Sequence, residues 1–321
     1  AADTSPQRKQ GDASSRRSRS GLVNDAPLVT VSIAHYNLGR YLPETLASLA
    51  AQTYPHLEVL VIDDGSTDAE SISVLQRMQA RYPRFRFLSQ ANAGIGATRN
   101  RGLREACGEY FLPMDADNVA RPDMVERFVA GMRRNPGLSS LTCYFLAFTE
   151  TADLARERYA YAYRPTGGPF VLASIRNVYG DANALFRTAD LRAVGGYETD
   201  RDTSCEDWEA FVKLAAAGYR LDVVPDYLFF YRHREAGFSR VTDGYRNHQR
   251  VLRQFLRTER LPPAERVLLW NALPGMQRRL EQLEEENRVL RRRSRSWRGL
   301  ISRLLRAVGR AEAEVGACQP A

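Results

Sequence analysis

Two aspartates one residue apart, Asp115 and Asp117, are the side chains of this sequence best suited to chemistry. They directly follow an apolar run from Tyr110 to Met114. Carboxylates at the carboxyl end of a buried strand make a suitable site for a hard divalent cation, and such a cation can hold a diphosphate. Paired acids also occur in ordinary surface turns, so the neighbouring sequence has to decide between the two interpretations.

The elements that position these acids alternate between strand and helix from residue 27 onward. Strand-like runs cover 28–34, 57–62, 86–89 and 110–114, and helical patterns lie between them at 41–53, 70–82 and 97–106. This alternation predicts an α/β fold with a doubly wound, mostly parallel sheet flanked by helices. Parallel strands place their carboxyl ends at one edge of a sheet. We therefore expect three polar clusters to share one crevice: His35-Tyr36-Asn37, Asp63-Asp64 and Asp115-Asp117.

The second half of the sequence is less regular. Residues 159–169 are rich in Tyr, Gly and Pro and predict a mobile loop. Residues 180–186 are predicted to enter a helix that ends at 195–197, and a second helix opens at Glu206-Asp207-Trp208. Acidic residues at a helix start can also simply complement the helix dipole. A last strand is predicted at 227–231, followed by Arg232 and His233.

The net charge of +8 lies at the two ends of the chain. Residues 1–20 hold five basic and two acidic side chains, and residues 276–310 hold eleven Arg and four Glu, whereas residues 21–275 are neutral overall. A nucleic-acid enzyme carries its basic surface on the folded domain, so no nucleic-acid partner is predicted for the body. The glycines at 94 and 96 lack the third glycine of a dinucleotide-binding fingerprint, because position 99 is Arg.

Cysteine usage and hydropathy indicate a cytoplasmic protein. The four cysteines are scattered and form no Cys-x-x-Cys, so neither a zinc site nor a disulfide framework is predicted. No apolar run of about 18 residues is found, and the first twenty residues hold no apolar segment. We expect no transmembrane helix and no signal peptide.

Seven segments, in this order, resemble the inverting family-2 glycosyltransferases with the GT-A fold, of the bacterial surface-glycan type. They are VSIAHYN (31–37), VIDDGSTD (61–68), NAGIGATRNRG (92–102), MDADN (114–118), VGGY (194–197), EDW (206–208) and YRH (231–233). Each is weak alone, but seven in order over residues 28–240 are specific. The resemblance implies a hexosyl- or N-acetylhexosaminyl-transferase.

The resemblance assigns the first half of the chain to a nucleotide-sugar donor, most simply a UDP-sugar. Asp117 is expected to hold Mn²⁺ or Mg²⁺, with His233 as a further ligand, and Asp115 to face the ribose or an ordered water. A lone His after a strand also has a purely structural interpretation. Such a cation would stabilise the charge on the departing diphosphate.

The same resemblance implies roles for the residues around the base and the phosphates. Asp64 is expected to accept from a pyrimidine base, and Tyr36 and Asn37 lie in the turn that would cradle this base. Arg99 matches a family arginine of the donor site, where a guanidinium suits phosphate. A salt bridge on the helix surface is the alternative interpretation of Arg99.

The resemblance assigns the second half to the acceptor. Asp207 matches the general base, which deprotonates the acceptor hydroxyl as it attacks the anomeric carbon. Glu206 is expected to orient the acceptor, and Trp208 either stacks on a sugar ring or packs in the core. Processive members carry a Gln-x-x-Arg-Trp element, which is absent here. We therefore expect addition of a single sugar to a glycan, a lipid-linked sugar or a protein.

Two other functions are compatible with such a body. A non-catalytic GT-A-like scaffold is disfavoured by the intact Asp115, Asp117 and Asp207. A sugar nucleotidyltransferase would carry a glycine-rich basic loop after the first strand, where this chain has only Gly39 and Arg40.

The predicted division of the chain adds four segments to the GT-A domain at 27–242. Residues 1–26 form a disordered basic tail, 243–272 a helical extension, 273–297 a short coiled coil and 298–321 a basic amphipathic tail. Asn287 at a core position of the heptads favours a parallel homodimer, whereas a solvated or domain-packed helix is the alternative. The last segment suits peripheral docking on an anionic membrane surface, at its inner face.

Overall fold

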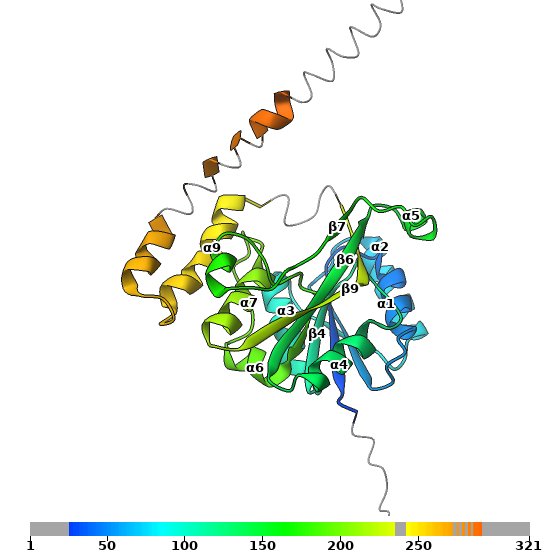
Figure 1. The fold of residues 1–321 in the computed structure, drawn as a ribbon. Coiled ribbons are helices and arrows are strands. Elements are labelled where there is room, and N and C mark those ends of the chain that lie inside the picture. The colour runs from blue at the N-terminus through cyan, green and yellow to red at the C-terminus, as the bar shows by residue number, and fades with distance from the viewer. Residues whose placement is uncertain are drawn as a thin grey trace, which may run out of the picture.

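The protein forms one mixed sheet with helices on both faces (Figure 1). This computed structural model describes residues 26–234 and 242–271, together with positions 275, 278–279, 282–283 and 285–290. The nine strands of these residues are β1 (Val29–His35), β2 (Leu57–Asp63), β3 (Arg86–Ser89), β4 (Tyr110–Asp115), β5 (Val119–Ala120), β6 (Leu138–Phe148), β7 (Tyr161–Tyr163), β8 (Leu185–Arg187) and β9 (Arg220–Arg232).

The helices connect these strands in the order expected for an α/β protein. They are α1 (Leu42–Ala50), α2 (Ala69–Arg81), α3 (Ile95–Glu105), α4 (Met124–Arg134), α5 (Thr151–Ala155), the 3₁₀ helix η1 (Phe170–Ser174), α6 (Thr188–Ala193), α7 (Glu206–Ala216) and α9 (Gly244–Arg257). A further helical stretch covers 263–271. The predicted α/β fold class is confirmed.

The first half of the sheet is the predicted parallel arrangement. Its strands lie in the order β3-β2-β1-β4, and every pairing among them is parallel. The register aligns His35 at the end of β1 with Asp63 of β2, and Ala34 with Asp115 of β4. The three polar clusters therefore follow strands that end at one level, as the sequence predicted.

The second half of the sheet is mixed. β8 is antiparallel to both β4 and β6, β5 is antiparallel to β9, and β7 to β6. The long pair β6 and β9 is parallel, and its register shifts where Val224 is followed by Pro225 and Asp226. Proline cannot donate a ladder hydrogen bond, which explains an irregularity at this point.

Several elements of the second half differ from the sequence expectations. No element is predicted above for 119–158, yet this stretch forms α4 and β6. The predicted helix after residue 180 begins only at Thr188, because 185–187 pair as β8 between two other strands. The predicted strand at 227–231 is the end of a longer β9, and the predicted loop at 159–169 contains β7.

The core has two layers, one on each face of the sheet. Alternation along β4 separates them: Leu112 and Met114 face the cluster that α1 and α4 cover, whereas Phe111 faces the cluster of α7 and α9. All three side chains are buried. The helix α9 packs on α7 through Val251, Leu252 and Phe255, so the two helices share one hydrophobic cluster.

The two ends of the chain fall mainly outside the described residues. The predicted tails at 1–26 and 298–321 lie there, except for Ala26, and so does much of the predicted coiled coil. The described positions between 275 and 290 are helical and exposed. In the described part of the chain, no helix is both long and apolar enough to cross a bilayer.

Candidate active site

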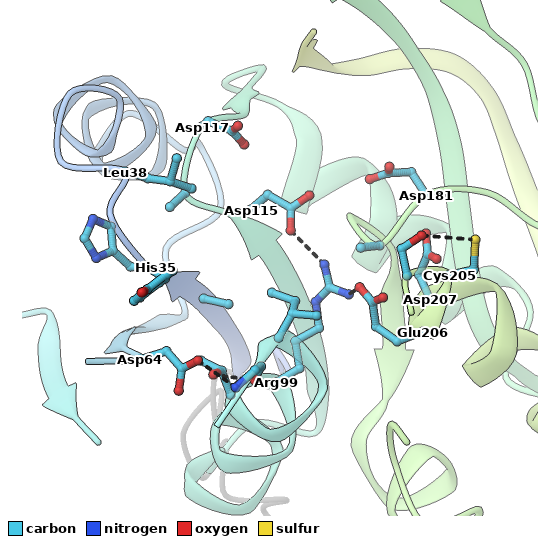
Figure 2. Close-up of a pocket in the computed structure, with 18 of the residues that line it drawn as sticks. His35, Leu38, Asp64, Arg99, Asp115, Asp117, Asp181, Cys205, Glu206 and Asp207 are labelled. Atoms are coloured by element: carbon cyan, nitrogen blue, oxygen red, sulfur yellow. Dashed lines mark hydrogen bonds and ion pairs between the residues drawn. The ribbon is translucent and has the colours of Figure 1, made fainter. Parts of the chain in front are cut away.

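A cavity of about 720 Å³ opens at the carboxyl ends of β1, β2 and β4 (Figure 2). This volume is in the range of a small-ligand site. All of the predicted site residues except His233 line it, namely Tyr36, Asn37, Asp64, Arg99, Asp115, Asp117, Glu206, Asp207 and Trp208. Side chains from β4, α3 and the start of α7 thus meet in one place, although Arg99 and Glu206 are 107 positions apart in the sequence.

The acidic turn after β4 is held from two sides. The Thr45 hydroxyl of α1 donates to the carbonyl oxygens of Ala116 and Asn118, at 2.9 and 2.8 Å. From β9, the backbone N–H of Arg232 donates to Asn118 Oδ1 at 3.0 Å, and Arg232 Nε donates to the Asp117 carbonyl at 3.1 Å. The turn is therefore rigid, and the carboxyl groups of Asp115 and Asp117 are presented by backbone that cannot easily shift.

The Asp117 carboxyl is nearly buried, with 8% of its side chain exposed. Arg234 Nε donates to its Oδ2 at 2.5 Å. Burial, reinforced by the like charge of Asp115, raises the pKa of Asp117 to about 6, so Arg234 does not fully offset the negative charge gathered here.

These surroundings fit a divalent cation. The ligand atoms are hard carboxylate oxygens, and the excess negative charge would be neutralised by a metal. Among the described residues, no group of three His, Cys, Asp or Glu side chains is arranged to hold a metal. Asp117 would therefore need water or phosphate oxygens as additional ligands.

His233, predicted as a second metal ligand, does not line the cavity. Its ring contacts the edge of the Tyr161 ring, with centroids 5.5 Å apart, and its Nδ1 lies 3.4 Å from the Tyr161 hydroxyl. In this arrangement His233 packs against β7 at the end of β9, and its role as a ligand stays a prediction.

Arg99 lies between two carboxylates from opposite sides of the cavity (Figure 2). Its Nη2 donates to Asp115 Oδ1 at 2.7 Å, and its Nη1 donates to Glu206 Oε1. The guanidinium is buried, with 4% exposed. Burial opposes the charged form, but Glu206 and then Asp115 raise the pKa of Arg99 above its usual value. Arg99 therefore joins the end of β4 to the start of α7, which neither predicted interpretation of this residue describes.

Asp207 lies beside Glu206 in the first turn of α7. Burial, followed by the charge of Glu206, raises the pKa of Asp207 to about 7. Its Oδ1 accepts a hydrogen bond from the Trp208 backbone N–H at 2.7 Å. A carboxyl with a pKa near neutrality is suited to take a proton from a hydroxyl and to release it again.

Asp181 is a site residue that the sequence analysis does not identify. It lines the cavity, and Figure 2 places it near Asp207. Burial, and then the charges of Asp115 and Asp207, raise the pKa of Asp181 to about 8. One oxygen accepts from the backbone and side-chain nitrogens of Asn183, at 3.0 and 2.6 Å. Asp181 stands in the segment predicted to enter a helix and belongs to none of the seven motif segments, so the sequence signal for this residue is weak.

Asp64 anchors the loop before α3. Its Oδ1 accepts from the Ala93 backbone at 2.9 Å and from Gln90 Nε2 at 2.7 Å, and its Oδ2 accepts from the Gly94 backbone at 2.8 Å. Each carboxylate oxygen has two acceptor sites, so Oδ2 retains one for a ligand. The predicted contact with a base therefore remains compatible with this geometry.

Tyr36 and Asn37 differ in what they can offer a ligand. The Tyr36 ring is 44% exposed at the cavity. The Asn37 side chain instead ties two loops together: its Oδ1 accepts from the backbone of Thr67 and Asp68, and its Nδ2 donates to the Thr67 hydroxyl. Asn37 has a φ of 51°, which this residue type tolerates. It shapes the turn in which Tyr36 is displayed.

Trp208 is packed against its neighbours at the edge of the cavity, and its stacking on a sugar ring stays a prediction. Its ring borders the cavity, stacks on His248 of α9 at 5.6 Å between centroids, and donates from Nε1 to the Ala173 carbonyl at 2.9 Å. The indole is therefore fixed by α9 and η1 while one part of it remains at the cavity.

Comparison with known proteins identifies the family. Residues 30–195, just over half of the chain, match the model of Glycosyl transferase family 2. Chondroitin synthase from Escherichia coli is 36% identical over 138 residues, which are 43% of this chain and 19% of that protein. An uncharacterized glycosyltransferase from Haemophilus influenzae is 34% identical over 129 residues, 40% of each protein. The matched part thus spans less than half of either relative.

Solved structures with the same fold include TarS and a mannosyltransferase. S. aureus TarS 1–349 in complex with UDP-GlcNAc superposes with a TM-score of 0.61 at 18% identity, covering 77% of this chain and 71% of TarS 1–349. The Pyrobaculum calidifontis mannosyltransferase PcManGT, in complex with GDP-Man and Mn²⁺, gives 0.56 at 24% identity, covering 76% and 68%. At these identities the likeness establishes the GT-A fold. The family match over more than half of the chain shows that it belongs to Glycosyl transferase family 2.

Proposed function

We propose that this chain transfers a single sugar from a nucleoside-diphosphate sugar to an acceptor hydroxyl, with inversion at the anomeric carbon. Asp207 is the general base, and a divalent cation is held at Asp117. One observation carries the proposal: Arg99 pairs with both Asp115 and Glu206, so it holds the acidic turn and the start of α7 across a single cavity.

The donor half of the proposed site is the edge formed by β1, β2 and β4. Tyr36 stacks on the base, the second oxygen of Asp64 accepts from it, and the diphosphate lies beside Asp117. A divalent cation bound there would supply positive charge to the departing diphosphate. Because TarS was solved with UDP-GlcNAc and PcManGT with GDP-Man and Mn²⁺, we infer a nucleotide-sugar donor and Mn²⁺ or Mg²⁺ for this chain.

The acceptor half is the side of α7. The acceptor hydroxyl lies against Asp207 and attacks the anomeric carbon from the face opposite the diphosphate. As the new C–O bond forms, Asp207 takes the hydroxyl proton and the bond from the sugar to the diphosphate breaks. The nucleoside diphosphate leaves, and the configuration of the sugar inverts.

Glu206 and Asp181 flank the base in this proposal. Glu206 is occupied by Arg99, and its Oε2 is buried without a hydrogen-bond partner among the described residues. An acceptor hydroxyl that donates to this oxygen would be oriented beside Asp207. The acceptor itself is a glycan, a lipid-linked sugar or a protein.

The test is a panel of UDP- and GDP-sugars with Mn²⁺, read as nucleoside-diphosphate release and as thermal shift. Asp207→Asn is expected to keep the donor-induced thermal shift and to lose about 100-fold or more of the release, as expected when a general base is removed. Asp117→Asn is expected to lose the metal-dependent part of the thermal shift. Asp222→Asn, which changes an exposed carboxyl of β9, is the control. Release by Asp207→Asn at the wild-type rate would remove Asp207 as the base.

A further inference from the structure

Four arginines from the described residues line the cavity, and they differ in how firmly they are held. Arg99 is buried and paired with two carboxylates. Arg232 is also buried: it pairs with Glu44, donates to backbone carbonyls, and its guanidinium lies over the rings of Tyr41 and Phe148. Arg201 is exposed and donates to Asn92 Oδ1. Neither buried guanidinium can turn toward a ligand without leaving a buried partner unpaired.

Arg234 is held differently from the other three. Its side chain is 28% exposed, its Nε donates to Asp117 Oδ2 at 2.5 Å, and its guanidinium lies 5.8 Å from the centre of the Tyr41 ring. A partly exposed side chain with one carboxylate partner can turn away once another cation takes its place at that carboxylate. That partner, Asp117, is the residue expected to ligate the metal.

Electrostatics make the two cations alternatives at this carboxylate. Asp117 Oδ2 cannot accept from Arg234 at 2.5 Å and face a divalent cation closely without the two positive charges repelling each other. A metal that takes the same oxygen therefore displaces the guanidinium. A diphosphate brought beside Asp117 offers oxygens that a planar guanidinium binds in a bidentate manner.

We propose that Arg234 is the counter-cation of the donor site before the donor binds: it competes with the divalent metal for Asp117 and, once displaced, pairs with the donor diphosphate. This inference rests on the proposed function, because it requires a metal and a diphosphate at this turn. It predicts that metal alone binds weakly, and that nucleotide and metal bind cooperatively since the diphosphate provides a new partner for the displaced guanidinium.

The test measures Mn²⁺ binding to the full chain by electron paramagnetic resonance of the free ion, without nucleotide and then with UDP. Arg234→Gln is expected to bind Mn²⁺ alone about 10-fold more tightly than wild type, the change that corresponds to about 1.4 kcal/mol. In saturating Mn²⁺, Arg234→Gln is expected to bind UDP about 10-fold more weakly than wild type, which again corresponds to about 1.4 kcal/mol. Arg234→Lys keeps the positive charge and is expected to stay closer to wild type in both titrations.

The matched control is Arg40→Gln. The Arg40 guanidinium also lies over Tyr41, at 5.5 Å, but it pairs with the exposed Glu150 rather than with Asp117. The substitution Arg40→Gln therefore removes one nearby positive charge without freeing Asp117. The affinities for Mn²⁺ and for UDP are both expected to stay at their wild-type values. A similar gain in Mn²⁺ affinity in both variants would reduce the effect to net charge and overturn the inference.

Two other outcomes separate the inference from the proposed function. If Arg234→Gln binds Mn²⁺ as wild type does, while Asp117→Asn loses it, the metal site stands and the competition is refuted. If the wild type binds no Mn²⁺ with or without UDP, both the metal requirement and the competition fail.

Discussion

At the level of single residues, the carboxyl of Asp207, the proposed general base, owes its raised pKa to its surroundings. Burial and the adjacent Glu206 raise its pKa to about 7, whereas Arg99 acts in the opposite direction. A carboxyl in bulk water would be ionised throughout the neutral range but would be a weak base. The first turn of α7 thus provides a stronger base than an exposed aspartate.

The pH dependence of transfer follows from this pKa. Only the ionised carboxylate accepts a proton, so kcat is expected to rise about tenfold per pH unit below pH 7 and to level off above it. Measurement of kcat from pH 5.5 to 8.5 at saturating donor and metal checks this. A profile that is flat between pH 5.5 and 7 would contradict the assignment, provided that the thermal shift shows the donor still bound at each pH.

Two substitutions of Arg99 distinguish its contribution to stability from its contribution to catalysis. Arg99→Met leaves the buried Glu206 and the partly exposed Asp115 without their counter-charge and is expected to cost about 3–5 kcal/mol of unfolding free energy. Arg99→Lys keeps a charge but cannot reach both carboxylates with one planar group, so a fall in kcat with little change in stability is expected. Urea denaturation and steady-state kinetics measure the two effects.

The control for Arg99 lies on the same helix. Arg101→Met removes an arginine of α3 that donates to the Ser89 carbonyl, and it is expected to cost about 1 kcal/mol or less. Equal losses of stability in Arg99→Met and Arg101→Met would show that the buried pairs of Arg99 contribute nothing specific.

At the level of elements, α9 supports α7, the helix that carries the proposed base Asp207. Arg250 of α9 and Glu209 of α7 form an ion pair at 2.5 Å, with 1% and 2% of their side chains exposed. Arg250 also donates to the carbonyl oxygens of Glu198 and Thr203 in the loop before α7. The position of Asp207 therefore depends on a helix that has no residue in the predicted motifs.

Replacement of Arg250 tests this support. Arg250→Met is expected to destabilise the protein by about 3–5 kcal/mol because Glu209 is left buried and unpaired. The double variant Arg250→Met/Glu209→Leu is expected to recover part of the loss, since no unpaired charge remains. Arg253→Met on the same helix breaks an exposed pair with Asp200 and is expected to cost at most about 1 kcal/mol. A double variant as unstable as the single one would assign the loss to the carbonyl contacts instead.

Gly96 shows how closely α3 and the loop before α7 approach each other. A Cβ at this position would lie 2.1 Å from the Glu198 carbonyl oxygen. Gly96, one of three glycines in the NAGIGATRNRG segment, is therefore required because α3 packs closely against the backbone of the loop before α7. The motif predicts that this glycine belongs to the family pattern, but one sequence cannot reveal which backbone it approaches.

At the level of the whole molecule, the carboxyls of the site make stability depend on pH. Asp117, Asp181 and Asp207 have folded-state pKa values of about 6, 8 and 7, above the value of about 3.9 for an unfolded aspartate. The folded state therefore binds more protons, and the stability that these groups contribute is present at low pH and is lost as pH rises through these values.

The protein without ligand is therefore expected to unfold at a lower temperature as the pH rises. Tm is expected to fall between pH 5.5 and pH 8.5, by roughly 2–4 °C for each kcal/mol lost. Asp181→Asn and Asp207→Asn remove a titrating group each and are expected to flatten the profile, whereas the exposed Asp222→Asn leaves its slope unchanged. A Tm that rises steadily over this range in the wild type would contradict the shifted values.

The parts of the fold and of the site that depend on neighbouring residues in the sequence could be predicted. The strand ends at His35, Asp63 and Asp115 meet because parallel register follows from the alternation of elements. Asp181 and Arg234 could not be identified, because the charges that act on them are distant in the sequence: Asp115 and Asp207 lie 66 and 26 positions from Asp181, and Asp117 lies 117 positions from Arg234. The strand β6 was also not predicted, since its mixture of apolar and small polar residues has no clear alternation.

The link that Arg99 makes between Asp115 and Glu206 sets a rule for recombining these enzymes. A chimera that joins the first half of this chain to the acceptor half of another family member brings together two surfaces that never evolved in contact. Its new specificity can be expressed only if the incoming half offers a carboxylate in the place of Glu206. Without one, Arg99 would face a gap, and the base would no longer be aligned with the sugar. Which halves of two enzymes can be combined therefore depends on the partners of the Arg99 guanidinium rather than on where the sequences are joined.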